Sequence, residues 1–167
     1  SEANTQNVAV GDPLNGIPGF PLTENGRQQV KNSIKNSDLP REGCIIYHSP
    51  FLRTLQTAEI AAEVLHCNAI YSIDALQERF LGDFELQENA WDNYEKMWKA
   101  DLENPDHHLF NLESVNEVLE RTMRFVLECE AKHTNETIIL VSHADPIKIF
   151  QTFFNGIEAS KHHTDIP

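Results

Sequence analysis

Two stretches of this chain share one pattern, in which a β-rich run leads into a polar turn and then into helix-forming residues. The turns and helix starts are residues 49–58 and residues 140–146. Each predicts a strand, a turn and a helix with proline at its first position. Such a junction leaves free backbone N–H groups and the positive end of a helix dipole beyond the strand. Because one junction carries Arg53 and the other His143, the pair predicts a site that handles phosphate.

Strands and helices alternate along the chain, which predicts an α/β fold with a mostly parallel central sheet and helices on both faces. The expected strands are 44–47, 69–73 and 137–141, and the expected helices are 23–36, 51–65, 88–102, 114–132 and 146–154. Glycine and proline punctuate residues 1–22, which we expect to form loops. In such sheets ligands bind beyond the carboxyl ends of the strands, where both junctions lie.

Two of the expected helices have additional sequence signals. Ser114 and Glu117 have the spacing of a capping box at the start of helix 114–132. Helix 88–102 carries an apolar stripe at helical spacing, which we expect to face inward. The stripe consists of Trp91, Tyr94, Trp98 and Leu102.

Composition narrows the range of partners. With 167 residues, 40% of them hydrophobic, residues 1–167 are long enough for a single domain with its own core. The net charge of -13 argues against nucleic acid or an anionic membrane as partner and favours a small phosphorylated metabolite in a local basic pocket. We recognise no transmembrane run or signal peptide, which predicts a cytoplasmic location. The sequence leaves open whether the chain forms a homo-oligomer.

The three cysteines are too few and too scattered to predict a disulfide framework. They are Cys44, Cys67 and Cys129. Cys44 and Cys129 fall at apolar positions of expected elements, so we expect them to be buried thiols.

Four blocks of the chain resemble, in family order, the histidine phosphatase superfamily, the phosphoglycerate mutase-like enzymes. They are residues 22–28, 52–58, 76–82 and 141–143. The resemblance implies a metal-independent phosphatase without a cofactor, which hydrolyses phosphomonoesters through a phosphohistidine.

The resemblance also implies that part of the enzyme lies outside these residues. The family nucleophile is the His of an Arg-His-Gly-x-Ser/Thr-x-x-Asn motif at the end of the first strand. Residues 1–4 resemble the tail of that motif, so we expect the nucleophile just upstream of Ser1. The domain is then truncated at both ends, without its first strand and a C-terminal edge strand, and is expected to be inactive alone.

The resemblance assigns phosphate contacts to four residues. Arg53 would clamp the phosphoryl oxygens in bidentate fashion, and His143 would donate to the same oxygens. Asn4 would donate its side-chain amide. Ala144 stands where the family usually has glycine, next to the bound phosphate.

Glu78 is the expected general acid, which protonates the leaving oxygen and then activates water. Its neighbour Arg79 is expected to keep Glu78 ionised and to contact the substrate, while Phe80 is expected to desolvate Glu78 and raise its pKa. Asp83 and Glu85 fit the family spacing less well.

Other residues depart from the family or from a binding role. Leu86 and Leu112 replace glycines that are usual in the family. The pairs 107–108 and 162–163 are adjacent histidines, which we interpret as solvated rather than as metal ligands, because no cysteine or carboxylate spacing completes a site.

The segment over the expected pocket favours a phosphatase over a mutase. A mutase must hold a phosphorylated carboxylic acid while it reorients and must retain a bisphosphate, and residues 87–111 offer only Lys96 and Lys99 for this purpose. The same segment carries the acidic residues Glu88, Asp92, Glu95, Asp101, Glu103 and Asp106. Two alternatives stay open: a phosphoglycerate mutase-type phosphotransferase, and a non-catalytic binding protein on the same fold.

Overall fold

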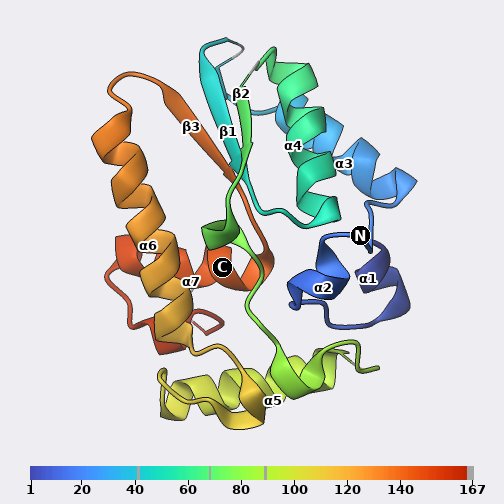
Figure 1. The fold of residues 1–167 in the computed structure, drawn as a ribbon, viewed down its shortest axis with the longest axis vertical. Helices are drawn as coiled ribbons and strands as arrows, with labels where there is room; N and C mark the ends of the chain where they lie inside the picture. Colours follow the sequence, from blue (N-terminus) through green and yellow to red (C-terminus); the bar gives the residue numbers. More distant parts are fainter. Residues whose placement is uncertain (41, 68, 89, 165–167) are drawn as a thin grey trace.

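The centre of the computed structural model, which describes residues 1–40, 42–67, 69–88 and 90–164, is a three-stranded parallel sheet (Figure 1). The strands lie in the order β2-β1-β3. They are β1 (Cys44–His48), β2 (Ala69–Ser72) and β3 (Thr137–Val141). All three expected strands are therefore present, and their parallel pairing confirms the predicted fold class.

The described residues form seven α-helices, of which α3, α4, α6 and α7 flank the sheet, while α1, α2 and α5 lie lower in Figure 1. They are α1 (Glu2–Gln6), α2 (Pro13–Gly16), α3 (Glu24–Lys35), α4 (Leu52–Leu65), α5 (Ala90–Glu103), α6 (Val115–Lys132) and α7 (Ala144–Asn155). Short 3₁₀ turns lie at η1 (Asp74–Leu76), η2 (Gly82–Phe84), η3 (Leu109–Asn111) and η4 (Ala159–Lys161).

Successive side chains of β1 pack on opposite faces of the sheet, as a strand requires. Cys44 and Ile46 belong to a core cluster with α4. Tyr47 belongs to a second cluster with Phe125 and Cys129 of α6. Helices therefore cover both faces, as predicted. The capping box at Ser114 and Glu117 is also confirmed at the start of α6.

The helix starts differ from expectation at both proline junctions. Phe51 is the N-cap of α4, so Pro50 precedes the helix instead of opening it. At the second junction His143 is the N-cap, and Pro146 lies in the first turn of α7. Proline is tolerated there because the first N–H groups of a helix have no intrahelical partner. Residues 1–22 also contain α1 and α2, where we expected loops.

The expectation of a buried thiol at Cys44 is wrong, because Cys44 forms a disulfide with Cys67. α4 runs back along β1, which brings the two Cα atoms to 5.6 Å, within the range that a disulfide spans. Cys129 is a buried free cysteine, as expected.

α5 lies beyond the carboxyl ends of the strands, at the bottom of Figure 1. The expected apolar stripe of α5 is only partly buried, since Trp91 is 64% exposed and Leu102 47% exposed. The face that packs inward carries Ala90, Met97 and Asp101 instead. In the described part of the chain, no helix has both the length and the apolar character that crossing a bilayer would require.

Candidate active site

The two strand–helix junctions meet at the carboxyl edge of the sheet. β1 and β3 are parallel neighbours, so their ends lie side by side. Arg53 is in the first turn of α4, and its Nε donates a hydrogen bond to Nδ1 of His143 at 3.1 Å. Ser49, at the end of β1, lies 2.8 Å from the other ring nitrogen of His143. The expected convergence of Arg53 and His143 is confirmed.

These contacts define the protonation of His143. Because Nδ1 accepts from Arg53, the neutral ring carries its hydrogen on Nε2 and donates it to Oγ of Ser49. Burial holds the pKa of His143 well below its usual range, and the charge of Arg53 lowers it further. His143 is therefore a neutral imidazole in this structure.

Glu78 lies next to both Arg53 and His143. Its Oε2 lies 3.8 Å from Nη2 of Arg53 and 3.7 Å from Nδ1 of His143, and its side chain is 10% exposed. Burial raises the pKa of Glu78 to about 8, with the charge of Asp145 adding to the rise and Arg53 opposing it. At neutral pH the carboxyl therefore holds a proton, as a general acid must.

A cavity of ≈ 690 Å³ opens at this edge of the sheet. Five of the predicted site residues line it, namely Asn4, Arg53, Glu78, His143 and Ala144. Nη1 of Arg53 is buried and has no hydrogen-bond partner among the described residues. That N–H group is available to an oxygen of a bound phosphate.

The sixth predicted residue, Arg79, lies elsewhere. Its side chain is fully buried, and both terminal nitrogens donate to Asp101 at 2.7 Å. Nε of Arg79 donates to the carbonyl of Glu113. The guanidinium therefore pairs with Asp101 instead of facing substrate or holding Glu78 ionised. Arg79 affects Glu78 through its backbone N–H, which donates to Oε1 at 3.0 Å.

The other residues named near Glu78 do not line the cavity either. Phe80 is 40% exposed and lines a different hollow, so the burial of Glu78 has another source. Glu85 accepts hydrogen bonds from the N–H groups of Gly11 and Asp12, which ties down the N-terminal loop. Asp83 accepts from the side chain of Asn111 at the surface.

Sequence reasoning missed several residues of the cavity wall. Tyr94 and Trp98 were expected to be core residues of α5, yet both line the cavity. Burial, and then the charge of Glu78, raises the pKa of Tyr94, so its hydroxyl keeps its proton. Asp145, Lys148 and His163 also line the cavity. Asp145 and Lys148 follow His143 closely in sequence, so the second junction could have identified them as cavity residues. No sequence signal indicated His163.

The expectation that the histidine pairs are solvated is wrong for three of the four residues. His107 is 7% exposed and bonds to Asp101 at 2.8 Å. His162 is fully buried. The ring of His163 stacks on Trp98 with centroids 3.6 Å apart. The fourth, His108, is exposed.

The two leucines that replace family glycines differ in their environment. Leu86 has a φ of 57°, in the left-handed region that glycine occupies without strain. Leu112 has an ordinary extended backbone and is 2% exposed, in the core beneath α5. Leu112 therefore supplies packing where a glycine would leave a gap.

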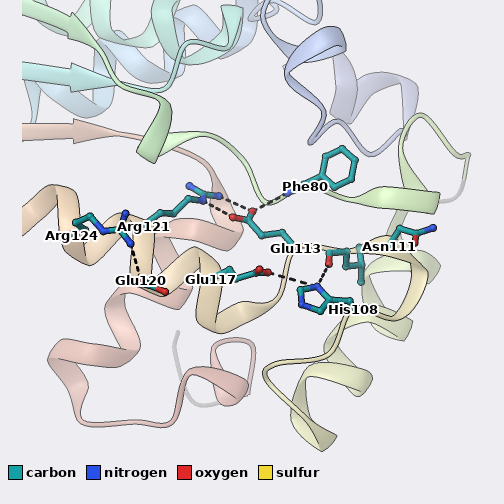
Figure 2. Close-up of a pocket in the computed structure, with 9 residues that line it drawn as sticks. Phe80, His108, Asn111, Glu113, Glu117, Glu120, Arg121 and Arg124 are labelled. Atoms are coloured by element: carbon teal, nitrogen blue, oxygen red, sulfur yellow. Dashed lines mark hydrogen bonds and ion pairs between the residues drawn. The ribbon is translucent and has the colours of Figure 1, made fainter.

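A second hollow, of ≈ 450 Å³, is lined by Phe80, His108, Asn111, Leu112, Glu113, Glu117, Glu120, Arg121 and Arg124 (Figure 2). Figure 2 shows Glu113 directed at Arg121, to which it is bonded at 2.7 Å. Arg124 pairs with Glu120. Arg121 also donates to the carbonyl of Glu78 at 3.2 Å, so it holds the segment that carries the expected acid.

Comparison with known proteins indicates one family. Residues 3–165 match the model of the histidine phosphatase superfamily (branch 1). The chain is 29% identical over 143 residues to phosphoserine phosphatase 1 of Hydrogenobacter thermophilus, covering 84% of this chain and 67% of that protein. It is 32% identical over 136 residues to the "Probable phosphoglycerate mutase GpmB" of Proteus mirabilis, covering 78% of this chain and 61% of that protein.

Solved structures share the fold. Bacillus stearothermophilus YhfR is 25% identical with a TM-score of 0.73, over 98% of this chain and 79% of that one. A mycobacterial glucosyl-3-phosphoglycerate phosphatase in complex with VO3 has a TM-score of 0.76 at 19% identity, over 97% of this chain and 80% of that one. The family model and the sequence similarity to phosphoserine phosphatase 1 support phosphatase activity here. Since the family model spans nearly all of the chain, we conclude that it belongs to the histidine phosphatase superfamily (branch 1).

Proposed function

We propose that this chain forms most of a phosphatase that hydrolyses small phosphomonoesters through a phosphohistidine intermediate. The observation that carries the proposal is the meeting of Arg53, Glu78 and His143 on one cavity, with a free Arg53 N–H and a protonated Glu78. A guanidinium holds phosphoryl oxygens, and a carboxyl group with a pKa near the working pH protonates a leaving group.

The proposed nucleophile is a histidine outside residues 1–167, which would stand shortly before Ser1. Ser1 and Asn4 line the cavity, so a residue shortly before Ser1 is within reach of a phosphate bound at Arg53. Attack by its imidazole nitrogen forms the N–P bond and breaks the P–O ester bond, while Glu78 gives its proton to the leaving oxygen. The Glu78 carboxylate then takes a proton from water, whose oxygen attacks phosphorus, breaks the N–P bond and releases phosphate and the free histidine.

His143 has a second role in this proposal. A bound phosphate offsets the positive charge of Arg53, which is one cause of the lowered pKa of His143. The imidazole then accepts a proton on Nδ1 in place of the hydrogen bond from Arg53, and it becomes a donor to a phosphoryl oxygen. Asn4 adds a side-chain amide from α1, and Ala144 adds the first backbone N–H of α7, at the positive end of that helix.

The cavity wall favours hydrolysis over phosphotransfer between two hydroxyl groups. α5 presents Trp91, Tyr94 and Trp98 to the cavity, which are aromatic rather than basic. Lys148 is the one lysine among the lining residues that the structure describes. A second phosphate of a bisphosphorylated acid would therefore meet little positive charge. Aromatic walls suit a small substrate with an apolar or planar leaving group.

The role of Glu78 is tested with the natural protein, including the residues that precede Ser1. Glu78→Gln should cripple hydrolysis of an alkyl phosphate but spare much of the activity on a nitrophenyl phosphate, whose leaving group needs no proton. Glu120→Gln, at an exposed ion pair, is the matched control. Equal slowing of both substrates by Glu78→Gln would remove Glu78 from the role of acid.

The covalent step has its own test. Brief reaction with radiolabelled substrate should trap an acid-labile, base-stable phosphoprotein, and activity should persist in a strong chelator. Loss of activity on chelation, restored by a divalent metal, would contradict the proposed chemistry. Residues 1–167 alone should bind phosphate without turnover. A natural protein that binds phosphate but neither traps label nor turns over would be the non-catalytic binding protein instead.

A further inference from the structure

Three side chains that the proposed phosphatase chemistry does not use meet at the wall of the cavity. They are Asp145 in the first turn of α7, and His162 and His163, which follow η4. One potential ligand atom from each lies within 4.8 Å of the others. Nε2 of His163 is 2.6 Å from Oδ1 of Asp145, and Nε2 of His162 is 3.9 Å from the same oxygen.

Two polar atoms of this cluster lack hydrogen-bond partners among the described residues, although both are buried. They are Oδ2 of Asp145 and Nε2 of His162. Asp145 is 4% exposed and His162 is fully buried. A buried polar atom without a partner is costly, so an unmatched carboxylate oxygen and an unmatched imidazole nitrogen in one cluster indicate a missing ligand.

The hydrogen bond of His162 prepares its ring for a cation. Its Nδ1 lies 2.9 Å from the carbonyl oxygen of Ala159, which can only accept, so Nδ1 carries the hydrogen. The lone pair of the neutral ring is then on Nε2, the atom without a partner. A backbone carbonyl that fixes the tautomer in this way is the usual outer partner of a metal-binding histidine.

The local charge also suits a cation. Arg79 forms a bidentate pair with Asp101 and lies 3.7 Å from Oδ2 of Asp145. One guanidinium stands against two carboxylates, so these three side chains together carry a net charge of about -1. A divalent cation bound here would therefore meet a small net negative charge and not a positive one.

We infer that Asp145, His162 and His163 bind one zinc-like divalent cation. Two imidazoles and a carboxylate are a ligand set that suits Zn²⁺, Co²⁺ or Ni²⁺ better than Mg²⁺ or Ca²⁺. At bond lengths of about 2.1 Å the ligand atoms would lie roughly 3.5 Å apart. The wider separations, which reach up to 4.8 Å, must therefore shorten, while the 2.6 Å contact between His163 and Asp145 must lengthen. To bind the cation through Nε2, His163 gives up the hydrogen bond that Nε2 donates to Oδ1 of Asp145 and carries its remaining proton on Nδ1.

The site has an open side. Asp145 and His163 line the same cavity as Arg53, so a fourth ligand comes from the cavity, as water or as an oxygen of a bound anion. This cation is separate from the proposed hydrolysis, which uses Arg53, Glu78 and a histidine nucleophile. The inference therefore stands whether or not the chain is a phosphatase.

The test titrates Zn²⁺ into tag-free protein and measures binding by isothermal titration calorimetry. The visible absorption of added Co²⁺ is the second readout. The protein should bind one Zn²⁺ per chain, and Co²⁺ should show the intense visible bands of a four-coordinate site. Asp145→Asn and His163→Ala should each weaken Zn²⁺ binding by at least 10- to 100-fold, the range seen even for outer-shell changes. Mg²⁺ should not compete with Zn²⁺.

His108→Ala is the matched control, because it removes an exposed histidine far from the cluster in sequence. It should bind Zn²⁺ as the parent protein does. Thermal unfolding with and without Zn²⁺ shows whether each variant folds, since a ligand of the native state raises Tm. Asp145→Asn is nearly isosteric and covers the case in which His163→Ala does not fold. Unchanged Zn²⁺ affinity in folded Asp145→Asn and His163→Ala, or no Zn²⁺ binding by the parent, overturns the inference.

Discussion

Nε of Arg53 donates to Nδ1 of His143 over 3.1 Å, a bond between two helix starts that lie 90 residues apart in sequence. The contact depends on the direction of the Nε–H bond, and it leaves Nη1 of Arg53 without a partner. One side chain thus fixes the tautomer of the imidazole and keeps a donor for phosphate. A lysine at position 53 would keep the charge but provide neither feature.

Arg53→Ala should lower both kcat and kcat/KM of the natural protein by about 10² to 10³-fold, on alkyl and aryl phosphates alike, because it removes a donor to the transition state. Arg53→Lys should recover only a small part of the loss. Steady-state kinetics on the two substrates measures this. Arg124→Lys, at an exposed ion pair, is the control. Full activity of Arg53→Lys would show that charge alone matters.

The pKa of Glu78 leads to a prediction about stability. It is about 8 in the folded protein against an ordinary value of 4.5, so the folded state binds the proton more tightly. This contribution is fully present below pH 4.5 and is lost as the pH rises through 8. Glu78→Gln should remove the loss, so the variant should gain stability relative to the parent between pH 5 and 9, by roughly 2–5 kcal/mol.

Urea unfolding across that pH range measures the difference between the parent and Glu78→Gln. Taking the difference removes other titrating groups, including His143, whose lowered pKa acts in the opposite direction. Glu120→Gln should give a curve parallel to that of the parent. A constant difference between the parent and Glu78→Gln would mean that Glu78 titrates normally.

The sequence predicted the parts of this fold that follow from local patterns and sheet geometry. The strand Thr137–Val141 has the expected bounds, and the capping box of Ser114 forms as expected. Arg53 and His143 converge because the carboxyl ends of adjacent parallel strands must share one edge. None of these required knowledge of a contact between distant side chains.

The errors concern residues whose partner lies far along the chain. Arg79 looked like a substrate contact because of its neighbour Glu78, but its partner is Asp101 on α5. His163 looked solvated because no cysteine or carboxylate spacing completed a site around the histidine pair, but its ring stacks on Trp98. A charged or aromatic side chain can satisfy itself in several ways, and sequence spacing does not say which one the fold supplies.

The buried pair of Arg79 and Asp101 leads to a second stability prediction. Both side chains have 0% exposure, so Arg79→Met leaves the Asp101 carboxylate buried without its guanidinium partner, although the hydrogen bond from His107 stays in place. The expected cost is about 3–5 kcal/mol of unfolding free energy, measured by urea unfolding. Arg124→Met, at an exposed pair, should cost no more than about 1 kcal/mol.

A double variant separates the two explanations of this loss. If the cost of Arg79→Met comes from the orphaned carboxylate, then Arg79→Met combined with Asp101→Leu should recover much of it, because two apolar side chains can replace a buried pair. If the double variant is as unstable as Arg79→Met alone, the bond from Nε of Arg79 to the carbonyl of Glu113 carries the stability instead.

Leu86 is the residue at which a glycine should stabilise the protein. Its φ is 57°, a conformation that costs a residue with a Cβ atom about 1–2 kcal/mol, and its N–H donates to the carbonyl of Ala9 at 2.9 Å, which holds the backbone there. Leu86→Gly removes the strain, while the greater freedom of glycine in the unfolded chain costs about 0.5–1 kcal/mol. The side chain is 45% exposed, so little packing is lost. We expect a net gain of about 0.5 kcal/mol in the free energy of unfolding, measured by urea unfolding.

Leu127→Gly is the matched control, since Leu127 is 62% exposed inside regular α6, where glycine should cost about 1 kcal/mol. If both leucine-to-glycine changes destabilise the protein equally, the backbone at Leu86 is not strained.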